Sequence, residues 1–315
     1  MSLSWIFQVY VIEFWAMVFG IFYDCFKGTV GLFFPGAPKS LKNDIVLVTG
    51  AAMGIGKLQA LNFAKKGVKM VICWDLNEVE NNKTVKEIQA LGVKAAGYKI
   101  NLCDRQAIYD LQKQVQKMVI DSFGPSAYVS ILVNNAGVVT GKKFMDSPDH
   151  LIDLTMNVNI NAHFWTLKSF LPKMIENKKG HVVTIASMAG IGAAPGMVDY
   201  NASKFAAVGF SEALKLEMEQ NNTGVEVTCI CPYLIDTGMF DGAKNKHDFI
   251  LPILKPDWVA GRIIKAVEYN EFVVMLPKFL FAAAWIKHML PFKSIIRMNQ
   301  FIGMNDTMSE FRGRK

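Results

Sequence analysis

From residue 44 onward, short apolar runs rich in β-branched residues alternate with longer amphipathic segments. Apolar runs of strand length between turn residues predict buried strands, and the segments between them predict helices. The predicted strands cover residues 44–49, 69–74, 95–100, 129–133, 181–185, 225–231 and 272–276. The first two predicted helices end near residues 66 and 91, and the others cover about 104–123, 148–176, 199–220 and 256–270. Because strands that alternate with helices are joined by crossover connections, this order predicts an α/β fold with a doubly wound parallel sheet.

The N-terminal part of the chain has a different character. Residues 5–23 form an almost wholly apolar stretch with one charged side chain, Glu13. A helix of this length would extend about 28 Å, close to the hydrocarbon thickness of a bilayer. Facing Glu13 toward lipid near the bilayer centre would cost roughly 2.5–3.5 kcal/mol. We therefore assign residues 1–34 as a hydrophobic membrane anchor, for which a spanning helix, a hairpin and an interfacial helix all remain open.

The flanks of this stretch indicate a retained anchor and its orientation. Residues 1–4 carry no charged side chain and no A-x-A cleavage pattern follows, which is unlike a secretory signal. Lys27, Lys39 and Lys42 follow the apolar stretch, and no basic residue precedes it. The positive-inside rule therefore places the rest of the chain in the cytosol. Residues 35–43, which contain two prolines and a glycine, are predicted to be a linker.

The overall charge and the cysteines narrow the classes of partner. The 315 residues include 34 Lys and Arg against 27 Asp and Glu, a formal net charge of +7. A basic balance suits an anionic membrane or a nucleic acid. The chain has no basic run interleaved with aromatic residues, so we favour the membrane and expect no nucleic acid. The five cysteines lack the spacing of a metal site, so we expect reduced thiols and no metal.

The first predicted strand runs directly into a glycine-rich turn. The segment Gly50-Ala51-Ala52-Met53-Gly54-Ile55-Gly56 follows the strand and opens the next helix. Glycines let the backbone approach a pyrophosphate closely, and a helix N-terminus favours its negative charge. This strand–turn–helix context predicts a Rossmann-type dinucleotide site. The candidate contacts in the turn are Gly50, Met53, Gly54, Ile55 and Gly56.

An acidic residue closes the second predicted strand. Asp75 follows the run 69–74 and lies 19 positions after Gly56. A carboxylate at this place can bind the two ribose hydroxyls of NAD and would repel the 2′-phosphate of NADP. We therefore predict NAD as the cofactor, with NADP less favoured.

Three polar residues lie around the fifth predicted strand and the helix after it. Ser187 follows strand 181–185, and Tyr200 and Lys204 are four residues apart, on one face of the helix 199–220. Tyrosine alone has a pKa of roughly 10, but an ammonium about 4 Å away at an effective dielectric near 20 favours the phenolate by up to ~4 kcal/mol. We therefore expect the pKa of Tyr200 to fall toward neutrality, as a general acid and base requires. A Y-x-x-x-K pair alone also fits a surface helix with a solvated lysine.

Taken together, these motifs resemble the short-chain dehydrogenase/reductase family. The matching residues, in family order over about residues 43–276, are Thr49-Gly50-x-x-x-Gly54-Ile55-Gly56, Asn134-Asn135-Ala136-Gly137, Asn159, Ser187, Tyr200-x-x-x-Lys204, Pro232 and Thr237. The apolar N-terminus and residues 162–165 and 255–258 are similar to the branch of membrane-bound epidermal retinol dehydrogenases and lipid-droplet 17β-hydroxysteroid dehydrogenases. The resemblance assigns residues 44–276 to a dinucleotide-binding catalytic domain, and residues 277–315 to an apolar and basic extension.

The resemblance implies a role for each catalytic candidate. Tyr200 would exchange the proton with the alcohol or carbonyl, and Ser187 would orient the reacting oxygen. Lys204 would lower the pKa of Tyr200 and hold the nicotinamide ribose, and Asn159 would hold a water of the proton relay. His163, one turn after Asn159 in an aromatic-rich helix, is expected to serve packing rather than catalysis.

The resemblance also implies further cofactor contacts. Beyond the glycine-rich turn and Asp75, these are Asn101, Asn135, Ala136, Gly137, Tyr200, Lys204, Pro232 and Thr237. Asn135 would line the adenosine side, and Thr237 would contact the carboxamide region. Asn101 departs from the aspartate that the family usually has for the adenine amino group, but an amide oxygen can still accept that bond.

Two segments carry no family motif. Residues 277–302 are apolar and aromatic with interspersed Lys and Arg, a composition that fits a cap on the substrate pocket, a membrane surface or a second subunit. We favour the membrane surface. The polar, glycine-containing segment 233–255 is expected to be a mobile substrate loop. The tail from residue 308 is polar and basic, so we expect it to be frayed.

The sequence therefore predicts an NAD-dependent oxidoreductase that interconverts a lipophilic primary or secondary alcohol and its carbonyl by hydride transfer. Retinol and a 17β-hydroxysteroid are the leading substrates, followed by a fatty alcohol or aldehyde. The alternative from another class is a membrane or lipid-droplet scaffold of the same fold with little turnover. The resemblance implies the endoplasmic reticulum membrane or lipid droplets and, by analogy, a homodimer, and the basic residues after the anchor predict a cytosolic catalytic domain.

Overall fold

The computed structural model describes residues 3–33, 36–247, 249 and 251–313. The chain divides into two compact units, residues 1–39 and residues 40–315. The boundary between them falls inside the segment 35–43 that we predict to be a linker.

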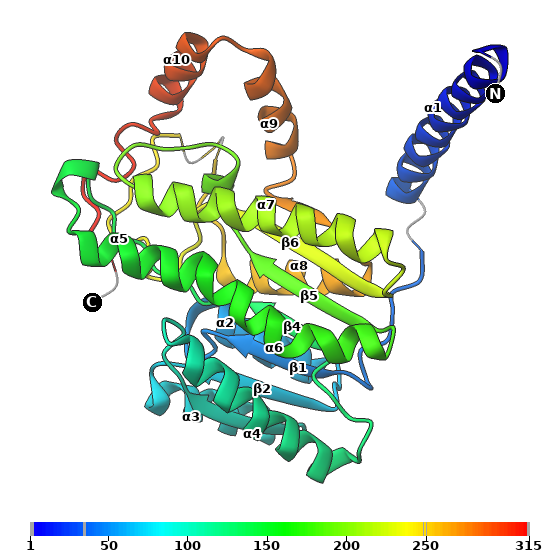
Figure 1. The fold of residues 1–315 in the computed structure, drawn as a ribbon. Helices are drawn as coiled ribbons and strands as arrows, with labels where there is room; N and C mark the ends of the chain where they lie inside the picture. The colour runs from blue at the N-terminus through cyan, green and yellow to red at the C-terminus, as the bar shows by residue number, and fades with distance from the viewer. Residues whose placement is uncertain (1–2, 34–35, 248, 250, 314–315) are drawn as a thin grey trace. The chain divides into compact units, whose positions relative to one another are not determined.

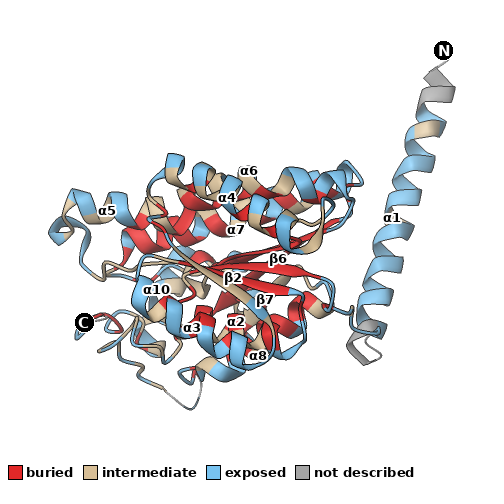
Figure 2. Ribbon diagram, turned by 90° about the horizontal axis from the view of Figure 1, so that it is seen from below, coloured by how far each residue is buried: buried red, intermediate tan, exposed pale blue. Residues whose placement is uncertain are grey.

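The first unit contains one long helix, α1 (Leu3–Phe33). Its 24-residue stretch Phe7–Val30 has a mean hydropathy of 1.6, and no residue of this stretch is buried (Figure 2). Large aromatic side chains such as Phe7, Phe19 and Phe22 are exposed along it. By length and composition, α1 is the one helix in the described part of the chain that could cross a membrane.

The second unit is built on a parallel sheet. Among the described residues, its seven strands are β1 (Ile45–Thr49), β2 (Met70–Asp75), β3 (Lys94–Lys99), β4 (Ile131–Asn134), β5 (Gly180–Ile185), β6 (Val225–Pro232) and β7 (Val273–Leu276). They lie in the order β3-β2-β1-β4-β5-β6-β7, and every neighbouring pair is parallel (Figure 1). The predicted doubly wound parallel sheet is confirmed.

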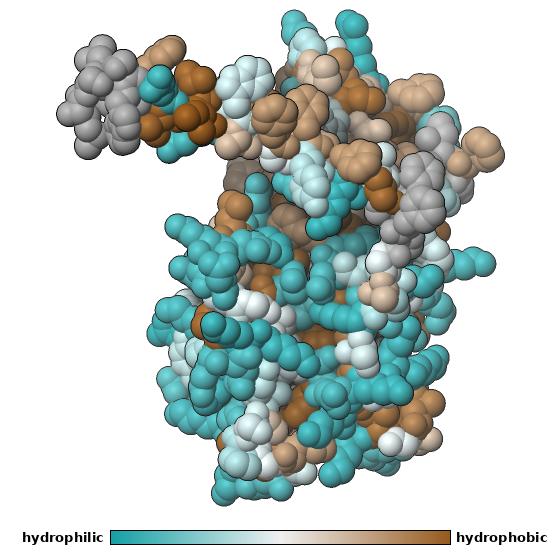
Figure 3. Space-filling model, turned by 90° about the vertical axis from the view of Figure 1, so that its right-hand side faces the viewer, coloured by the Kyte–Doolittle hydropathy of each residue, from teal (hydrophilic) through white to brown (hydrophobic). Residues whose placement is uncertain are grey.

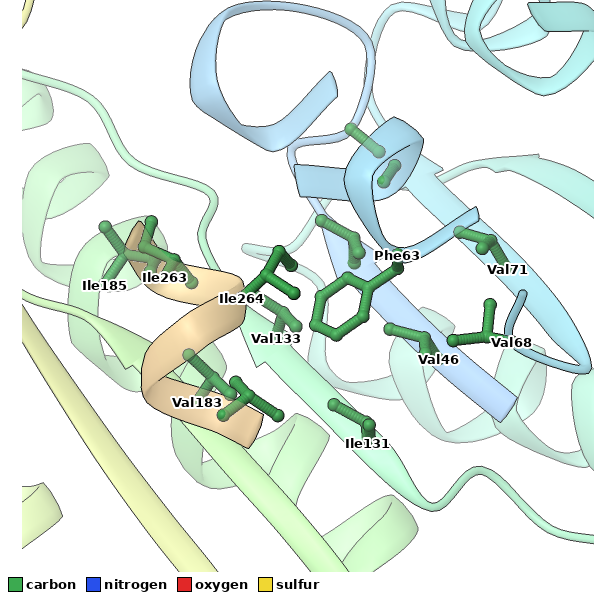
Figure 4. Packing of buried hydrophobic residues seen from close by; sticks show 14 of the residues in the cluster. Val46, Phe63, Val68, Val71, Ile131, Val133, Val183, Ile185, Ile263 and Ile264 are labelled. Carbon is green, nitrogen blue, oxygen red and sulfur yellow. The ribbon is translucent and has the colours of Figure 1, made fainter. Parts of the chain in front are cut away.

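Helices cover both faces of this sheet. Their bounds are α2 (Gly54–Lys65), α3 (Glu78–Ala90), α4 (Arg105–Phe123), α5 (Asp149–Met156), α6 (Ala162–Glu176), α7 (Val198–Gln220), α8 (Pro256–Glu268), α9 (Leu280–Met289) and α10 (Phe292–Ile302). Helices α2, α3 and α8 pack on one face, where Figure 4 shows Phe63 of α2 between the strands and Ile264 of α8. Helices α4, α6 and α7 pack on the other face, where the rings of Trp74 and Phe170 lie 5.6 Å apart. The strands β1, β2, β4, β5 and β6 are buried almost throughout, as their apolar runs predict, whereas the edge strand β3 is only partly buried (Figure 2).

The structure interrupts the helix that we predict over residues 148–176. A π-helical turn at Asn157–Asn161 separates α5 from α6. Such a turn holds one extra residue, which a 3.6-residue hydrophobic period does not reveal. The turn lies beside α7, because the side chain of Asn159 donates to Ser203 Oγ on that helix at 3.0 Å.

Two helices and an ordered tail follow the sheet. Helices α9 and α10 form the arch drawn in orange and red in Figure 1. The tail beyond them folds back onto the loop 233–255, where the N–H of Arg312 donates to the carbonyl of Asp241 at 2.9 Å and Met308 is buried. Our expectation of a frayed tail is therefore wrong for the residues described up to 313. Met308 and Phe311 stand singly among polar residues, so no periodicity revealed their packing.

Candidate active site

The strand order reverses between β1 and β4, and ligands of open α/β sheets bind in the crevice at such a point. Asn135, just after β4, holds this crevice together. Its side-chain nitrogen donates to the carbonyls of Thr49 and Gly50 at 2.9 and 3.2 Å, and its oxygen accepts from Gln59 Nε2 at 2.9 Å. The side chain of Asn135, which we predict to line the adenosine side, therefore joins β1, β4 and α2.

In the glycine-rich turn after β1, the backbone at Gly56 lies directly against the backbone at Gly50. Gly50 has a φ of +67°, and a Cβ on Gly56 would lie 2.0 Å from the Gly50 carbonyl oxygen. Within the described part of the chain, the N-cap residue of α2, Met53, makes no side-chain capping hydrogen bond. The N–H groups of the first turn of α2 can therefore bind an anion, and this turn fits the pyrophosphate of a dinucleotide.

A cavity of about 670 Å³ opens along this edge of the sheet. Every residue that we predict to contact the cofactor lines it: Gly50, Met53, Gly54, Ile55, Gly56, Asp75, Asn101, Asn135, Ala136, Gly137, Tyr200, Lys204, Pro232 and Thr237. Leu76, Ile100 and Leu102 line the same cavity and were not predicted, although they adjoin Asp75 and Asn101 in the sequence. Residues that follow β1 through β6 thus converge on one space.

Two side chains at the edge of the sheet are held by backbone groups. Asp75 Oδ2 accepts from the N–H of Ala52 at 2.9 Å, and its Oδ1 accepts from the N–H of Asn77 at 2.8 Å. These bonds fix the carboxylate beside the glycine-rich turn. Asn101 Oδ1 accepts from the N–H of Cys103 at 3.0 Å, and a second lone pair on that oxygen can accept another bond.

Ser187, Tyr200 and Lys204 lie in the wall of the same cavity. Lys204 Nζ donates to the carbonyl of Ile185 at 2.8 Å and lies 5.6 Å from the centre of the Tyr200 ring. Ser187 Oγ accepts from the N–H of Ala189 at 3.1 Å. Tyr200 and Lys204 are buried, so their protonation depends on the protein rather than on bulk water.

Burial shifts the pKa values of this pair in opposite directions. It raises the pKa of Tyr200 to about 12, against a hydrogen bond from Ser187 that lowers it. It lowers the pKa of Lys204 to about 8. Our expectation that Lys204 brings the pKa of Tyr200 toward neutrality is therefore wrong for this structure. Burial destabilises the phenolate more than the neighbouring groups stabilise it. At pH 7, Tyr200 is protonated and Lys204 is mostly charged.

Asn159 and His163 lie behind the cavity rather than in its wall. Asn159 Oδ1 accepts from the N–H of Val138 at 2.8 Å, and its Nδ2 donates to the Val138 carbonyl and to Ser203 Oγ. Its side chain thus ties the π-helical turn to α7, and the water-holding role stays a prediction. His163 packs against Phe210, with ring centres 6.0 Å apart, and burial lowers its pKa to about 3. His163 is therefore neutral.

A second, apolar cavity of about 170 Å³ shares part of its wall with the first. The residues that line both cavities are Ser187, Tyr200, Tyr233 and Phe240. The rest of the second cavity is lined largely by apolar side chains from the loop after β5 and from α9 and α10. The side chains of Ser187 and Tyr200 therefore lie between a cavity large enough for a nucleotide and a cavity suited to an apolar molecule.

Sequence reasoning missed several aromatic and apolar side chains around Tyr200. The ring of Phe240 packs edge-on against Tyr200 at 5.7 Å, and Phe311 packs against Phe240 at 6.4 Å. Met308 joins Tyr200 and Met197 in one buried cluster. Their one signal in the sequence is that apolar residues recur in otherwise polar segments.

Comparisons with known proteins agree with this geometry. A family model described as short chain dehydrogenase matches residues 44–248. Epidermal retinol dehydrogenase 2 of Homo sapiens is 39% identical over 283 residues, which cover 89% of each chain. A short-chain dehydrogenase/reductase from Burkholderia phymatum in complex with NAD has a TM-score of 0.70 at 23% identity, over 80% of this chain and 95% of that one. A metagenomic short-chain oxidoreductase in complex with NADP has a TM-score of 0.61 at 25% identity, over 76% and 97%.

The family model and the relatives show that this chain is an NAD(P)-dependent oxidoreductase, and the two cavities that meet at Tyr200 agree with that class. The chain belongs to the short-chain dehydrogenase family, which confirms the resemblance seen in its motifs. Of the two similar structures named above, one contains NAD and the other contains NADP. The choice between these cofactors therefore has to be argued from residues of this chain.

Proposed function

We propose that this protein is an NAD-dependent oxidoreductase that interconverts a lipophilic alcohol and its carbonyl, with Tyr200 as acid and base. The observation that carries the proposal is the shared wall, in which Ser187 and Tyr200 line both the dinucleotide cavity and the apolar cavity. A shared wall supports a transfer between a group bound in one cavity and a group bound in the other.

The residues of the site would divide the work as follows. A bound nicotinamide dinucleotide supplies or accepts the hydride, and the turn 50–56 and Asp75 would hold its pyrophosphate and its adenosine ribose. Ser187 Oγ would donate to the reacting oxygen and fix its position. The Tyr200 hydroxyl would give its proton to that oxygen in carbonyl reduction and take one back in alcohol oxidation. The charge of Lys204 would stabilise the phenolate that forms in between.

The apolar lining and the relatives together support the substrate class. The cavity beside Tyr200 is walled largely by apolar side chains, which favour a hydrocarbon body. The relative at 39% identity is named as a retinol dehydrogenase, so retinol is our first candidate substrate. A 17β-hydroxysteroid and a fatty alcohol are the next. A scaffold without turnover would need neither Ser187 nor Tyr200 in the shared wall.

We expect membranes that contain the protein to oxidise retinol faster than a 17β-hydroxysteroid or a long-chain fatty alcohol, with NAD preferred over NADP. The same membranes carrying Tyr200→Phe set the background rate. Turnover above that background for one of the three alcohols supports the proposal. Rates equal to the background for all three, with either cofactor and in either direction, would contradict it and favour the scaffold.

We expect Asp75→Ala to narrow the preference for NAD over NADP. The Asp75 carboxylate, held by the N–H groups of Ala52 and Asn77, would accept from the adenosine ribose and repel a 2′-phosphate. Asp75→Asn keeps the shape and removes the charge, so it separates repulsion from the loss of hydrogen bonds. The ratio of kcat/KM values for the two cofactors is the measurement. A wild-type preference for NADP would show that this interpretation of Asp75 is wrong.

Helix α1 supports a membrane location, for which we propose the endoplasmic reticulum membrane or lipid droplets with a cytosolic catalytic domain. Deleting residues 1–35 should move most of the protein to the soluble fraction, unless residues 277–302 also bind membrane. The truncated chain should stay folded, because all seven strands and the described core clusters lie beyond residue 40. Sedimentation and thermal unfolding report the two outcomes.

Orientation is tested separately, on the full-length chain. Protease added outside intact microsomes should digest the catalytic domain, and alkaline carbonate should leave an inserted anchor in the membrane. Full protection of the catalytic domain would overturn the cytosolic orientation.

A further inference from the structure

Helices α9 and α10 have two different faces. Toward the protein, Leu280, Ala284 and Ile295 are among the residues that line the apolar cavity beside Tyr200. Toward solvent, both helices expose large apolar side chains that do not line it. These are Phe281, Trp285, Met289, Phe292, Ile296 and Phe301, between 42% and 81% exposed, and we call them the outer face. A monomer rarely leaves so many neighbouring large apolar side chains in water without a partner for them.

The charges around the outer face have one sign. Residues 272–305 contain no Asp or Glu, whereas Lys278, Lys293 and Arg297 are exposed there. None of these three basic side chains is in an ion pair with a described residue. On the side of the molecule drawn in Figure 3, tan and brown side chains gather at the end of the domain where Figure 1 places α9 and α10. Aromatic side chains with basic neighbours fit the surface of an anionic bilayer.

We propose that the outer face of α9 and α10 docks on an anionic phospholipid surface, so that the apolar cavity takes its substrate directly from the hydrocarbon. The docking concerns surface chemistry alone, and the delivery of substrate rests on the proposed function. One layer of helices would separate the lipid from the cavity, and a helix with its side chains is only about 10 Å thick. A lipophilic alcohol could then pass between α9 and α10 to the hydroxyl of Tyr200 without entering water.

Helix α9 is bound to the loop that borders the candidate active site. Lys287 Nζ on α9 donates to the carbonyl of Ile191 at 2.5 Å and lies 5.3 Å from the centre of the Phe205 ring. Ile191 belongs to the loop between Ser187 and α7, and it lines the apolar cavity as well. A bilayer that holds α9 would therefore hold the mouth of the cavity too.

A second copy of the chain fits the outer face less well than a bilayer does. In a two-fold dimer the same patch meets itself, so the exposed Lys278, Lys293 and Arg297 of both copies would come together. No acidic side chain within residues 272–305 could offset that repulsion. An anionic lipid surface instead supplies the opposite charge to all three.

The test uses the full-length chain in vesicles of phosphatidylcholine, with or without phosphatidylserine. Hydrogen exchange of the peptides over residues 278–302 gives a local readout that anchoring through α1 does not produce. We expect slower exchange in these peptides when phosphatidylserine is present. The double variant Trp285→Ser, Phe292→Ser should lose most of that protection. Trp258→Ser with Phe144→Ser, a matched pair of exposed side chains on other elements, should keep it.

A kinetic comparison follows the substrate route. The Trp285→Ser, Phe292→Ser variant should lower kcat/KM for a membrane-partitioned long-chain alcohol by at least roughly tenfold, because it withdraws two large aromatic side chains from apolar contact and the loss of one is already on that scale. Its kcat/KM for a short water-soluble alcohol should not change, because neither residue lines the cavity.

Each result bears on one statement. Equal exchange of residues 278–302 with and without vesicles would overturn the docking. Protection that grows with protein concentration in the absence of lipid would also overturn it, in favour of a second copy. Protection by vesicles together with equal losses for both alcohols would contradict substrate delivery. If the wild type oxidises neither alcohol, the proposed function fails while the exchange data still decide the docking.

Discussion

Tyr200→Phe should lower turnover by roughly 100-fold or more while dinucleotide binding stays intact, because it removes the one proposed proton donor and keeps the ring. The Tyr200 ring is buried and packs edge-on against Phe240, and Tyr200→Phe keeps this ring. We therefore expect the variant to stay folded. Turnover and NAD binding, measured on the same preparation, separate the two effects. Turnover near that of the wild type would refute the assignment of Tyr200.

A matched control and the pH dependence sharpen this test. Tyr233→Phe removes a hydroxyl from a residue that lines the same two cavities, and turnover should change far less. In the wild type, alcohol oxidation should rise toward alkaline pH, because burial raises the pKa of Tyr200 to about 12 and little phenolate exists at pH 7. Carbonyl reduction should fall above about pH 8, where Lys204 loses its charge. A flat profile in both directions between pH 6 and 10 would contradict these roles.

Gly56→Ala should strongly weaken dinucleotide binding and destabilise the domain. A Cβ at this position would lie 2.0 Å from the Gly50 carbonyl oxygen and 2.4 Å from Asn135 Nδ2, so the glycine-rich turn has to move. Overpacking of this kind costs about 1–3 kcal/mol of the free energy of unfolding. The same movement would break the bonds that Asn135 makes across β1, β4 and α2. Thermal unfolding and NAD titration are the measurements.

Gly261→Ala is the matched control for this substitution. Gly261 also lies inside a helix, α8, but apart from its chain neighbours and the helix's own backbone, no atom of the described residues lies within 4 Å of the Cβ that it would gain. Alanine is the better helix former, so this variant should be as stable as the wild type or more stable by up to about 1 kcal/mol. NAD affinity equal to that of the wild type in both variants would show that the turn does not hold the pyrophosphate.

The sheet was predictable because its signal is local. Strands such as β1 and β6 are unbroken apolar runs, and burial on both faces requires such runs. The π-helical turn at Asn157–Asn161 was not predictable, because it depends on hydrogen bonds to a loop and to α7. The helices α9 and α10 lay in a segment whose composition fitted three arrangements, among which it favoured the membrane surface without fixing the contacts.

The site was predictable as far as its residues belong to motifs. Every predicted cofactor contact lines one cavity, because parallel strands end at one edge of the sheet. The protonation state of Tyr200 was not predictable. The four-residue spacing on a helix gives the approximate distance from Tyr200 to the Lys204 ammonium, but it does not give the depth of burial, which sets the pKa of Tyr200. The contributions of Phe240 and Met308 depend on the tail folding back over the loop, a long-range contact without a local signal.

The folded tail has a practical consequence for anyone who labels this protein. Met308 and Phe311 place the described end of the chain against the ring that contacts Tyr200. A fluorescent protein joined directly behind them would pull on that contact, so a fusion could reach the correct organelle and still turn over slowly. A marker inserted in the solvent-exposed turn at Phe144–Asp146 would avoid the conflict between imaging and activity.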